Sequence, residues 1–141
     1  MKKLLICTLA FCIIFCFTAC NFRLPYNLEG TASVEIHAYG NESAEPVAEF
    51  VVKGEDAERI VEMFSSLKLK EMNYTEPSIR GYEFWFRDKN GDQIAKLELP
   101  YGHSPWVVVG GSVYQDVNSG IDTEYLAQLV DIASTSGPMV K

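Results

Sequence analysis

Cysteine is missing from most of the chain. The four cysteines all lie within the first 20 residues, at Cys7, Cys12, Cys16 and Cys20. Residues 21–141 therefore carry no thiol, which excludes a disulfide, a cysteine nucleophile and a zinc thiolate site from this part of the chain. A domain of about 120 residues is large enough to be stabilised by its hydrophobic core alone.

Positive charge is also scarce. Residues 20–141 contain all 19 acidic side chains but only 10 of the 12 lysines and arginines, which leaves a net charge of −9. Phosphate backbones and anionic lipid headgroups repel such a surface. We therefore expect neither a nucleic-acid partner nor an electrostatic contact with the membrane.

Beyond residue 17 the sequence has no hydrophobic run long enough to cross a bilayer. The one long run, Leu4 to Phe17, follows two lysines and precedes the small pair Thr18-Ala19. Its 14 residues would span about 21 Å as a helix, less than the ~30 Å hydrocarbon core of a membrane. This order of charged, apolar and small segments predicts a secretory signal peptide over residues 1–19 rather than a transmembrane helix.

Phe17-Thr18-Ala19-Cys20 resembles the lipobox of bacterial lipoprotein signals, whose cysteine is lipidated and becomes the first mature residue. The resemblance covers only this segment, and Phe17 departs from the Leu, Val or Ile that the family prefers there. Cleavage by an ordinary signal peptidase fits less well, because that enzyme prefers small residues at both flanking positions and Phe17 is large. The resemblance implies an anchor through acyl chains on Cys20, at the outer side of the cytoplasmic membrane.

The next ten residues, 21–30, show no periodicity and contain Pro25 and Gly30. We expect Cys20 and these residues, 20–30 together, to form a flexible tether that lifts the following domain clear of the headgroups. One domain would then span residues 31–136, because the chain length leaves room for no second one. The small and polar residues 137–141 predict a frayed tail.

Two hydrophobic periods indicate the fold class. Apolar residues spaced by three and four predict helices at 54–68 and 123–134, with Asp122 as the N-cap of the second. Alternating apolar and polar residues predict six strands: Ala32–Tyr39, Pro46–Lys53, Gly81–Asp88, Gln93–Leu99, Trp106–Val109 and Ser112–Gln115. Residues 67–72 are a candidate for a short seventh strand. We therefore expect an α+β fold in which two amphipathic helices pack on one face of an antiparallel sheet of about five to six strands. This layout is similar to that of many small exported lipoproteins of Gram-positive bacteria whose function is unassigned.

One short motif is similar to a metal site without completing it. Asp88, Asn90 and Asp92 match the opening of a calcium loop, but Gln93 replaces the glycine at its sixth position and Leu99 the glutamate at its twelfth. We interpret these residues as the turn of a hairpin, since Asn-Gly between two alternating strands is a strong hairpin signal. The sequence predicts no metal site and no cofactor.

The candidates for catalysis are equally incomplete. His37 and His103 are the only histidines, and we expect one on an outer strand face and the other in a loop. His103 and Ser104 beside an acid would suit a hydrolytic triad, but no serine lies in a G-x-S-x-G elbow. Glu83 and Glu98 should point the same way from neighbouring strands, on an open solvated face rather than in the cleft that a glycosidase needs.

One candidate binding surface lies on the hairpin of residues 81–99. If the apolar residues that alternate with Glu83, Trp85 and Arg87 pack under the helices, Trp85 is left on the outer face of the sheet. An aromatic side chain beside an arginine is typical of interface anchors. The candidate protein-binding surface is Trp85, Arg87, Ile94 and Lys96, with Trp106 and Tyr114 as candidate neighbours. In the alternative interpretation, Trp85 packs against Lys96 or Arg87 as an ordinary cross-strand pair.

These observations favour a non-enzymatic binding or accessory module of the cell envelope, held to the membrane through Cys20. Its partner would be an envelope protein or peptide. Two alternatives remain open: a small envelope hydrolase that uses Glu or Asp with His103, and a purely structural lipoprotein.

Overall fold

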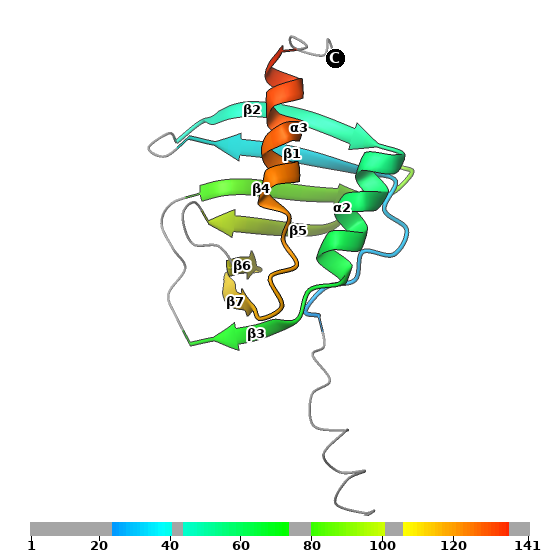
Figure 1. The fold of residues 1–141 in the computed structure, drawn as a ribbon. Coiled ribbons are helices and arrows are strands. Elements are labelled where there is room, and N and C mark those ends of the chain that lie inside the picture. Colours follow the sequence, from blue (N-terminus) through cyan, green and yellow to red (C-terminus); the bar gives the residue numbers. More distant parts are fainter. Residues whose placement is uncertain (1–23, 41–43, 74–79, 101–105, 136–141) are drawn as a thin grey trace, which may run out of the picture.

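The computed structural model describes residues 24–40, 44–73, 80–100 and 106–135. These residues form the predicted α+β fold, with a sheet and two helices (Figure 1). The helices are α2 (Glu55–Ser65) and α3 (Thr123–Thr135). The strands are β1 (Ser33–Tyr39), β2 (Pro46–Lys53), β3 (Leu69–Met72), β4 (Arg80–Arg87), β5 (Gln93–Pro100), β6 (Trp106–Val109) and β7 (Ser112–Asp116).

The seven strands form one antiparallel sheet in the order β2-β1-β4-β5-β6-β7-β3. This exceeds the expected five to six strands because the candidate strand after α2 does form and pairs with β7, with Leu69 opposite Asp116. The hairpins β1-β2 and β4-β5 are joined side by side by antiparallel pairing of β1 with β4. After β2, at one edge of the sheet, the chain crosses through α2 to β3 at the opposite edge.

Both helices cover the same face of the sheet (Figure 1). The ring of Phe64 in α2 lies 4.9 Å from that of Phe84 and 5.8 Å from that of Phe86, in edge-on contacts that aromatic pairs prefer. All three side chains are fully buried, and the alternating apolar residues of β1, β4 and β5 complete this core. We call the other face of these three strands the outer face. Among the described elements, no helix covers it.

Polar contacts join α2 to the start of α3. As expected for an N-cap, the Asp122 carboxylate accepts a hydrogen bond from the Tyr125 amide at 2.9 Å. Asp122 also pairs with Arg59 of α2 at 3.2 Å, and the Arg59 guanidinium lies 3.7 Å from the centre of the Tyr125 ring. The Tyr125 hydroxyl donates to Asp56 at 2.9 Å, and burial, aided by that carboxylate, raises the pKa of Tyr125 to about 12.

Residues 24–30 differ from the expected flexible tether. Leu28 is buried in the core, and Leu24 and Tyr26 pack against it. The Tyr26 hydroxyl donates to the carbonyl of Phe64 at 2.8 Å, and the Thr31 hydroxyl donates to that of Leu28 at 2.8 Å. The prediction of a tether over residues 20–30 is therefore wrong for residues 24–30, which belong to the domain. Pro25 and Gly30 mark bends in a packed segment rather than a loose one.

The Asp88 motif forms a turn. Its carboxylate accepts hydrogen bonds from the amides of Asn90 at 2.7 Å and Asp92 at 3.0 Å, and Gly91 adopts a φ of 88°, which favours glycine. These contacts account for the spacing of Asp88, Asn90 and Asp92 without a calcium ion.

Within the described ranges, no helix is both long and apolar enough to cross a membrane.

Candidate functional site

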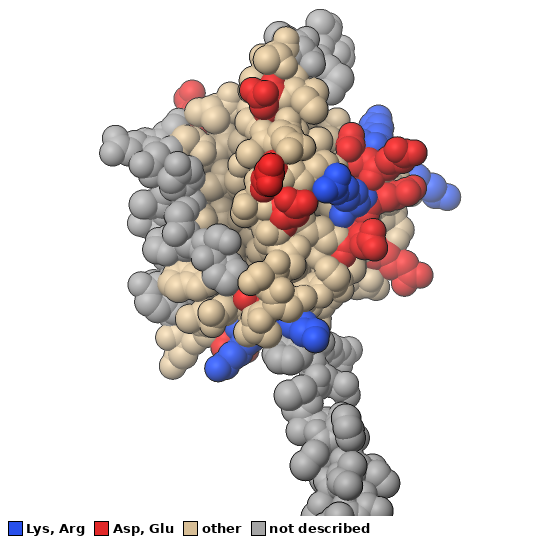
Figure 2. Space-filling model, in the orientation of Figure 1, with Lys and Arg blue, Asp and Glu red and all other residues tan. Residues whose placement is uncertain are grey.

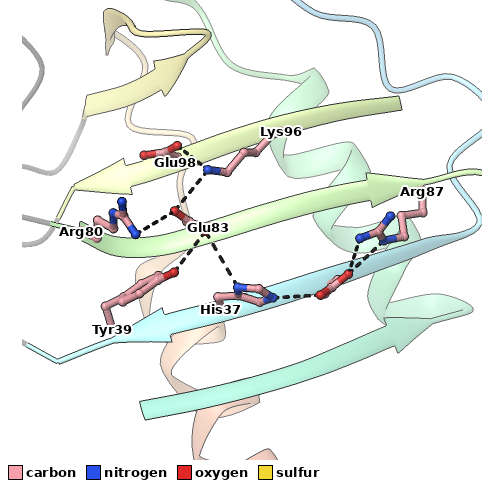
Figure 3. Close-up of polar contacts among 8 residues, drawn as sticks. His37, Tyr39, Arg80, Glu83, Arg87, Lys96 and Glu98 are labelled. Carbon is pink, nitrogen blue, oxygen red and sulfur yellow. Dashed lines mark hydrogen bonds and ion pairs between the residues drawn. The ribbon is translucent and has the colours of Figure 1, made fainter. Parts of the chain in front are cut away.

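The outer face gathers charged side chains from the three central strands β1, β4 and β5. Register explains why they meet. Glu83 of β4 lies opposite His37 on β1 and Glu98 on β5, while Trp85 lies opposite Glu35 and Lys96. Because residues directly opposite on antiparallel strands point to the same face, these side chains converge. We call the polar set the outer network: Glu35, His37, Tyr39, Arg80, Glu83, Arg87, Lys96 and Glu98 (Figure 3).

Glu83 is the centre of the outer network (Figure 3). Only 4% of its surface is exposed, although it is a charged residue on the face without a helix. Its carboxylate accepts hydrogen bonds from the Tyr39 hydroxyl at 3.1 Å and the Lys96 ammonium at 3.2 Å. Arg80 and His37 approach it to 3.7 Å and 3.8 Å. A buried carboxylate needs such partners, because desolvation without them would be costly.

Glu35 forms the second centre. One of its oxygens accepts hydrogen bonds from Nε and Nη2 of Arg87 at 2.9 Å and 2.7 Å, and the other lies 2.9 Å from Nε2 of His37. The imidazole of His37 therefore bridges Glu35 and Glu83, with one ring nitrogen toward each carboxylate. This bridge joins the two halves of the outer network across β1 and β4.

Charge in the outer network is balanced. Leaving His37 aside, three carboxylates face three cations, since Lys96 also pairs with Glu98 at 2.7 Å. Burial lowers the pKa of Lys96, but the hydrogen bonds to Glu98 and Glu83 outweigh it and leave that pKa raised. The balance contrasts with the net charge of −9 carried by residues 20–141.

Trp85 lies among these cations and is only partly buried. The Lys96 ammonium lies 4.9 Å from its ring centre and the Arg87 guanidinium 5.9 Å, both within cation–π range. The His37 ring is 6.0 Å away. Within the described part of the chain, the indole Nε1 is buried and finds no acceptor. An unsatisfied buried donor costs about 1–3 kcal/mol, so the indole is held by its ring contacts and not by a hydrogen bond.

The protonation of the two central carboxyls limits the chemistry of this face. Burial alone would raise the pKa of Glu83. The hydrogen bond and charge of Lys96, together with Tyr39 and Arg80, outweigh this effect and lower the pKa below its ordinary value of 4.5. The hydrogen bond with His37 is the largest influence on the pKa of Glu35, which is also lowered. Both groups are therefore ionised at neutral pH and have no proton to donate. Such an arrangement suits recognition of a partner better than general acid catalysis.

Three of the four predicted surface residues, Trp85, Arg87 and Lys96, lie together on the outer face. Ile94 does not join them. The register shifts between Phe86 and Arg87, so that Arg87 faces Gln93, and Ile94 is half-buried against the hydrophobic core. The expected exposed position of Ile94 is therefore wrong, because the alternation of β5 breaks at this bulge.

The two further aromatic candidates lie on β6 and β7. Tyr114 is half-buried and packs against the hydrophobic core, so it is not part of the outer face. Trp106 is half-buried and lies opposite Gln115 of β7. The cross-strand packing of Trp85 with Lys96, the alternative interpretation, is what the structure shows. It does not remove Trp85 from the surface, since the indole stays partly exposed.

The sequence pattern did not identify Glu35, His37 and Tyr39 as partners of this surface. Alternation places all three on one face of β1, but only the pairing of β1 with β4 brings them against Glu83 and Arg87. That pairing joins residues about 50 positions apart, which no short motif signals. The expectation that Glu83 and Glu98 lie on neighbouring strands is confirmed, since they are direct cross-strand partners. The expected solvated position is wrong for Glu83, which is only 4% exposed.

The remaining predicted positions lie outside the described residues. These are Cys20, the proposed lipid site, and His103 with Ser104, on which the hydrolase alternative depends. In the described ranges, no group of three or more His, Cys, Asp or Glu side chains could hold a metal ion.

Comparison with known proteins finds no relative of this chain. No family model matches the sequence, and no curated protein or solved structure is similar to it. The geometry of the outer face and the N-terminal sequence are therefore the grounds for inferring a function.

Proposed function

We propose that this protein is a lipid-anchored binding module of the cell envelope, which contacts an envelope protein or peptide through its outer face. One observation carries the proposal: the pairs Arg80–Tyr39 and Arg87–Trp85 both lie on the sheet face that neither described helix covers. Tryptophan, tyrosine and arginine are the residue types most enriched among the energetic centres of protein interfaces.

The accessibility of the two arginines supports the proposal. The Arg80 side chain is 58% exposed, and that of Arg87 is 33% exposed. Both are held in place by carboxylates, Glu83 and Glu35, so a partner would meet donors that are already oriented. Less conformational entropy is lost when such preorganised side chains bind.

The charge balance indicates what kind of partner fits. The outer network neither attracts nor repels a charged molecule strongly, because its carboxylates and cations cancel. Recognition would depend on hydrogen bonds and on contact with the Trp85 ring rather than on net charge. We therefore expect an association that weakens only modestly with salt, unlike the binding of a cationic ligand to an acidic surface.

The N-terminal sequence supports the anchoring part of the proposal. A basic start, a short apolar run and Phe17-Thr18-Ala19-Cys20 fit lipidation of Cys20 after export. The anchor predicts that the wild-type chain incorporates labelled fatty acid and remains with the membrane, whereas Cys20→Ser incorporates none. Equal labelling of both chains would contradict lipidation at Cys20.

The binding part is tested with the full chain, purified from its own envelope in mild detergent with a C-terminal tag. Trp85→Ala with Arg80→Glu removes the outer-face contacts, whereas Glu58→Ala with Glu62→Ala changes exposed residues of α2 as a matched control. We expect one defined protein to be captured by the wild type and the control and lost with the outer-face variant. The purified partner should then bind the wild type saturably. Capture that is unchanged in a folded outer-face variant would contradict the proposal.

A further inference from the structure

Residues 24–30 fix the position at which the domain meets any membrane anchor. Leu28 is 4% exposed in the core, and the Tyr26 hydroxyl donates to the carbonyl of Phe64 near the end of α2. Burial raises the pKa of Tyr26, so this hydroxyl stays protonated and able to donate. The segment from Leu24 onward therefore moves with the domain.

Very little chain then remains between the proposed lipid and the packed segment. Only residues 21–23 separate Cys20 from Leu24. Four consecutive Cα steps span at most about 15 Å even when fully extended. The headgroup region of one leaflet already takes up about 5–8 Å, since bilayers measure ~40–45 Å with headgroups and ~30 Å without. A domain attached in this way stays in contact with, or within one side-chain length of, the membrane surface.

The sheet topology defines which end of the domain lies nearest the membrane. The chain enters the domain beside β3 (Figure 1). In the strand order, β3 forms one edge of the sheet and β2 the other. Six strand spacings of about 4.8 Å separate them by up to roughly 29 Å along the sheet. The β3 edge therefore faces the membrane, and the β2 edge points away from it.

The charge at the β3 end is compatible with this orientation. Lys68, Lys70 and Glu71 are exposed there, and Asp116 of β7 lies opposite Leu69, so two cations and two carboxylates balance at this edge of a strongly acidic domain. Figure 2 shows blue side chains with a little red at the lower end of the described molecule, and a larger cluster of red side chains, with blue ones among them, higher up. Anionic headgroups would repel this end least. The short linker imposes the contact, and the local charge does not oppose it.

We propose that the β3 edge of the domain contacts the lipid headgroups directly. The sheet is then roughly perpendicular to the membrane plane, and its outer face is accessible from the side, within about 30 Å of the bilayer. This inference rests on the proposed lipidation of Cys20 and deepens it. The outer face would meet a partner that is itself in or on the same membrane. A freely diffusing domain on a long tether would have no such restriction.

Single-cysteine spin labelling tests the orientation, because the mature sequence has no other free cysteine. Lipidated full-length protein carrying Lys70→Cys on β3 or Val47→Cys on β2 would be placed in vesicles of phosphatidylglycerol and phosphatidylethanolamine. The readout is relaxation enhancement of the label by a nickel-chelating headgroup lipid. We expect strong enhancement at position 70 and values near those of lipid-free protein at position 47.

A matched control lengthens the linker. Ten glycine and serine residues inserted between Asn21 and Phe22 should abolish most of the enhancement at position 70. Equal enhancement at both positions without the insert, or no effect of the insert, would overturn the proposed orientation. Mass analysis of the peptide that carries Cys20 separates the two proposals. If Cys20 carries lipid but the relaxation enhancement is equal at positions 70 and 47, only the proposed orientation is wrong. If Cys20 carries no lipid, both the proposed anchor and the proposed orientation are wrong.

Discussion

At the scale of single residues, Glu83 carries the outer network. Among the described residues, it is the one carboxylate that contacts side chains from β1, β4 and β5 together. Exchange for glutamine keeps its size but removes the charge that Lys96 and Arg80 face. A hydrogen bond to a charged group contributes about 1.5–3 kcal/mol, so we expect Glu83→Gln to lower the free energy of unfolding by about 2 kcal/mol.

Urea unfolding followed by circular dichroism measures this loss for Glu83→Gln. Glu62→Gln on α2 is a matched control, because its side chain is exposed and the change should stay within about 0.5 kcal/mol. Equal stability of the two variants would show that the carboxylate contributes nothing to the fold.

The same carboxyls predict a response to acid. The folded-state pKa values of Glu35 and Glu83 lie below 4.5, the ordinary value that applies in the unfolded chain. The unfolded state therefore takes up protons first, and the stability that these ion pairs supply is fully present above pH 4.5 and is lost as the pH falls through the folded values. Unfolding free energies measured over this range should decline more steeply for the wild type than for Glu35→Gln with Glu83→Gln. Parallel curves would contradict this account.

At the scale of elements, the N-cap residue of α3, Asp122, has two roles that substitutions can separate. Asp122 accepts a hydrogen bond from the Tyr125 amide and also pairs with Arg59, where both side chains are about half exposed. Asparagine caps a helix about as well as aspartate, whereas alanine does not. We expect Asp122→Ala to cost about 1 kcal/mol and Asp122→Asn much less, because an exposed ion pair contributes little. Thermal unfolding of the two variants checks the order, and equal losses would assign the stability to the ion pair instead.

The segment before β1 gives a second prediction at this scale. If residues 24–30 belong to the domain, Leu28→Ala leaves a cavity in the core and should lower the free energy of unfolding by about 2–4 kcal/mol. The neighbouring exposed change Glu29→Ala should have little effect. Denaturant unfolding of both variants measures the difference. A stability of Leu28→Ala equal to that of the wild type would restore the interpretation of these residues as a tether.

The elements themselves were largely predictable from local pattern. Alternation along Ser33–Tyr39 and Arg80–Arg87, and the helical spacing of Ala57, Ile60 and Phe64, reflect burial of one side of each element. Residues 24–30 gave no such signal, because a packed segment without regular structure has no period. Ile94 was misplaced for a related reason: one extra residue at a bulge reverses the faces that alternation assigns.

At the scale of the whole molecule, the order of the strands decides the candidate site. Local pattern predicts hairpins, but the neighbours of each hairpin depend on contacts between residues far apart in sequence. The pairing of β1 with β4 places His37 between Glu35 and Glu83 and so creates the outer network. Apart from Ile94, the sequence therefore predicted which of these side chains point outward, but it could not predict which of them meet.

This arrangement assigns different roles to the two faces of the sheet. The face under α2 and α3 holds the hydrophobic core, while the outer face holds charges that are paired within the protein. Because those pairs are already satisfied, a partner can bind without leaving a buried charge unpaired. We propose that this outer face, and not the helical layer, meets the partner.

Site-specific photocrosslinking in intact cells tests that claim most directly. A benzophenone amino acid would replace Arg80, whose side chain is 58% exposed on the outer face, or Glu58, which is exposed on α2. The account predicts one adduct of defined mass from position 80, lost when Trp85→Ala is added, and none from position 58. An adduct from position 58 alone, or no adduct from position 80 in a folded and membrane-bound chain, would contradict it.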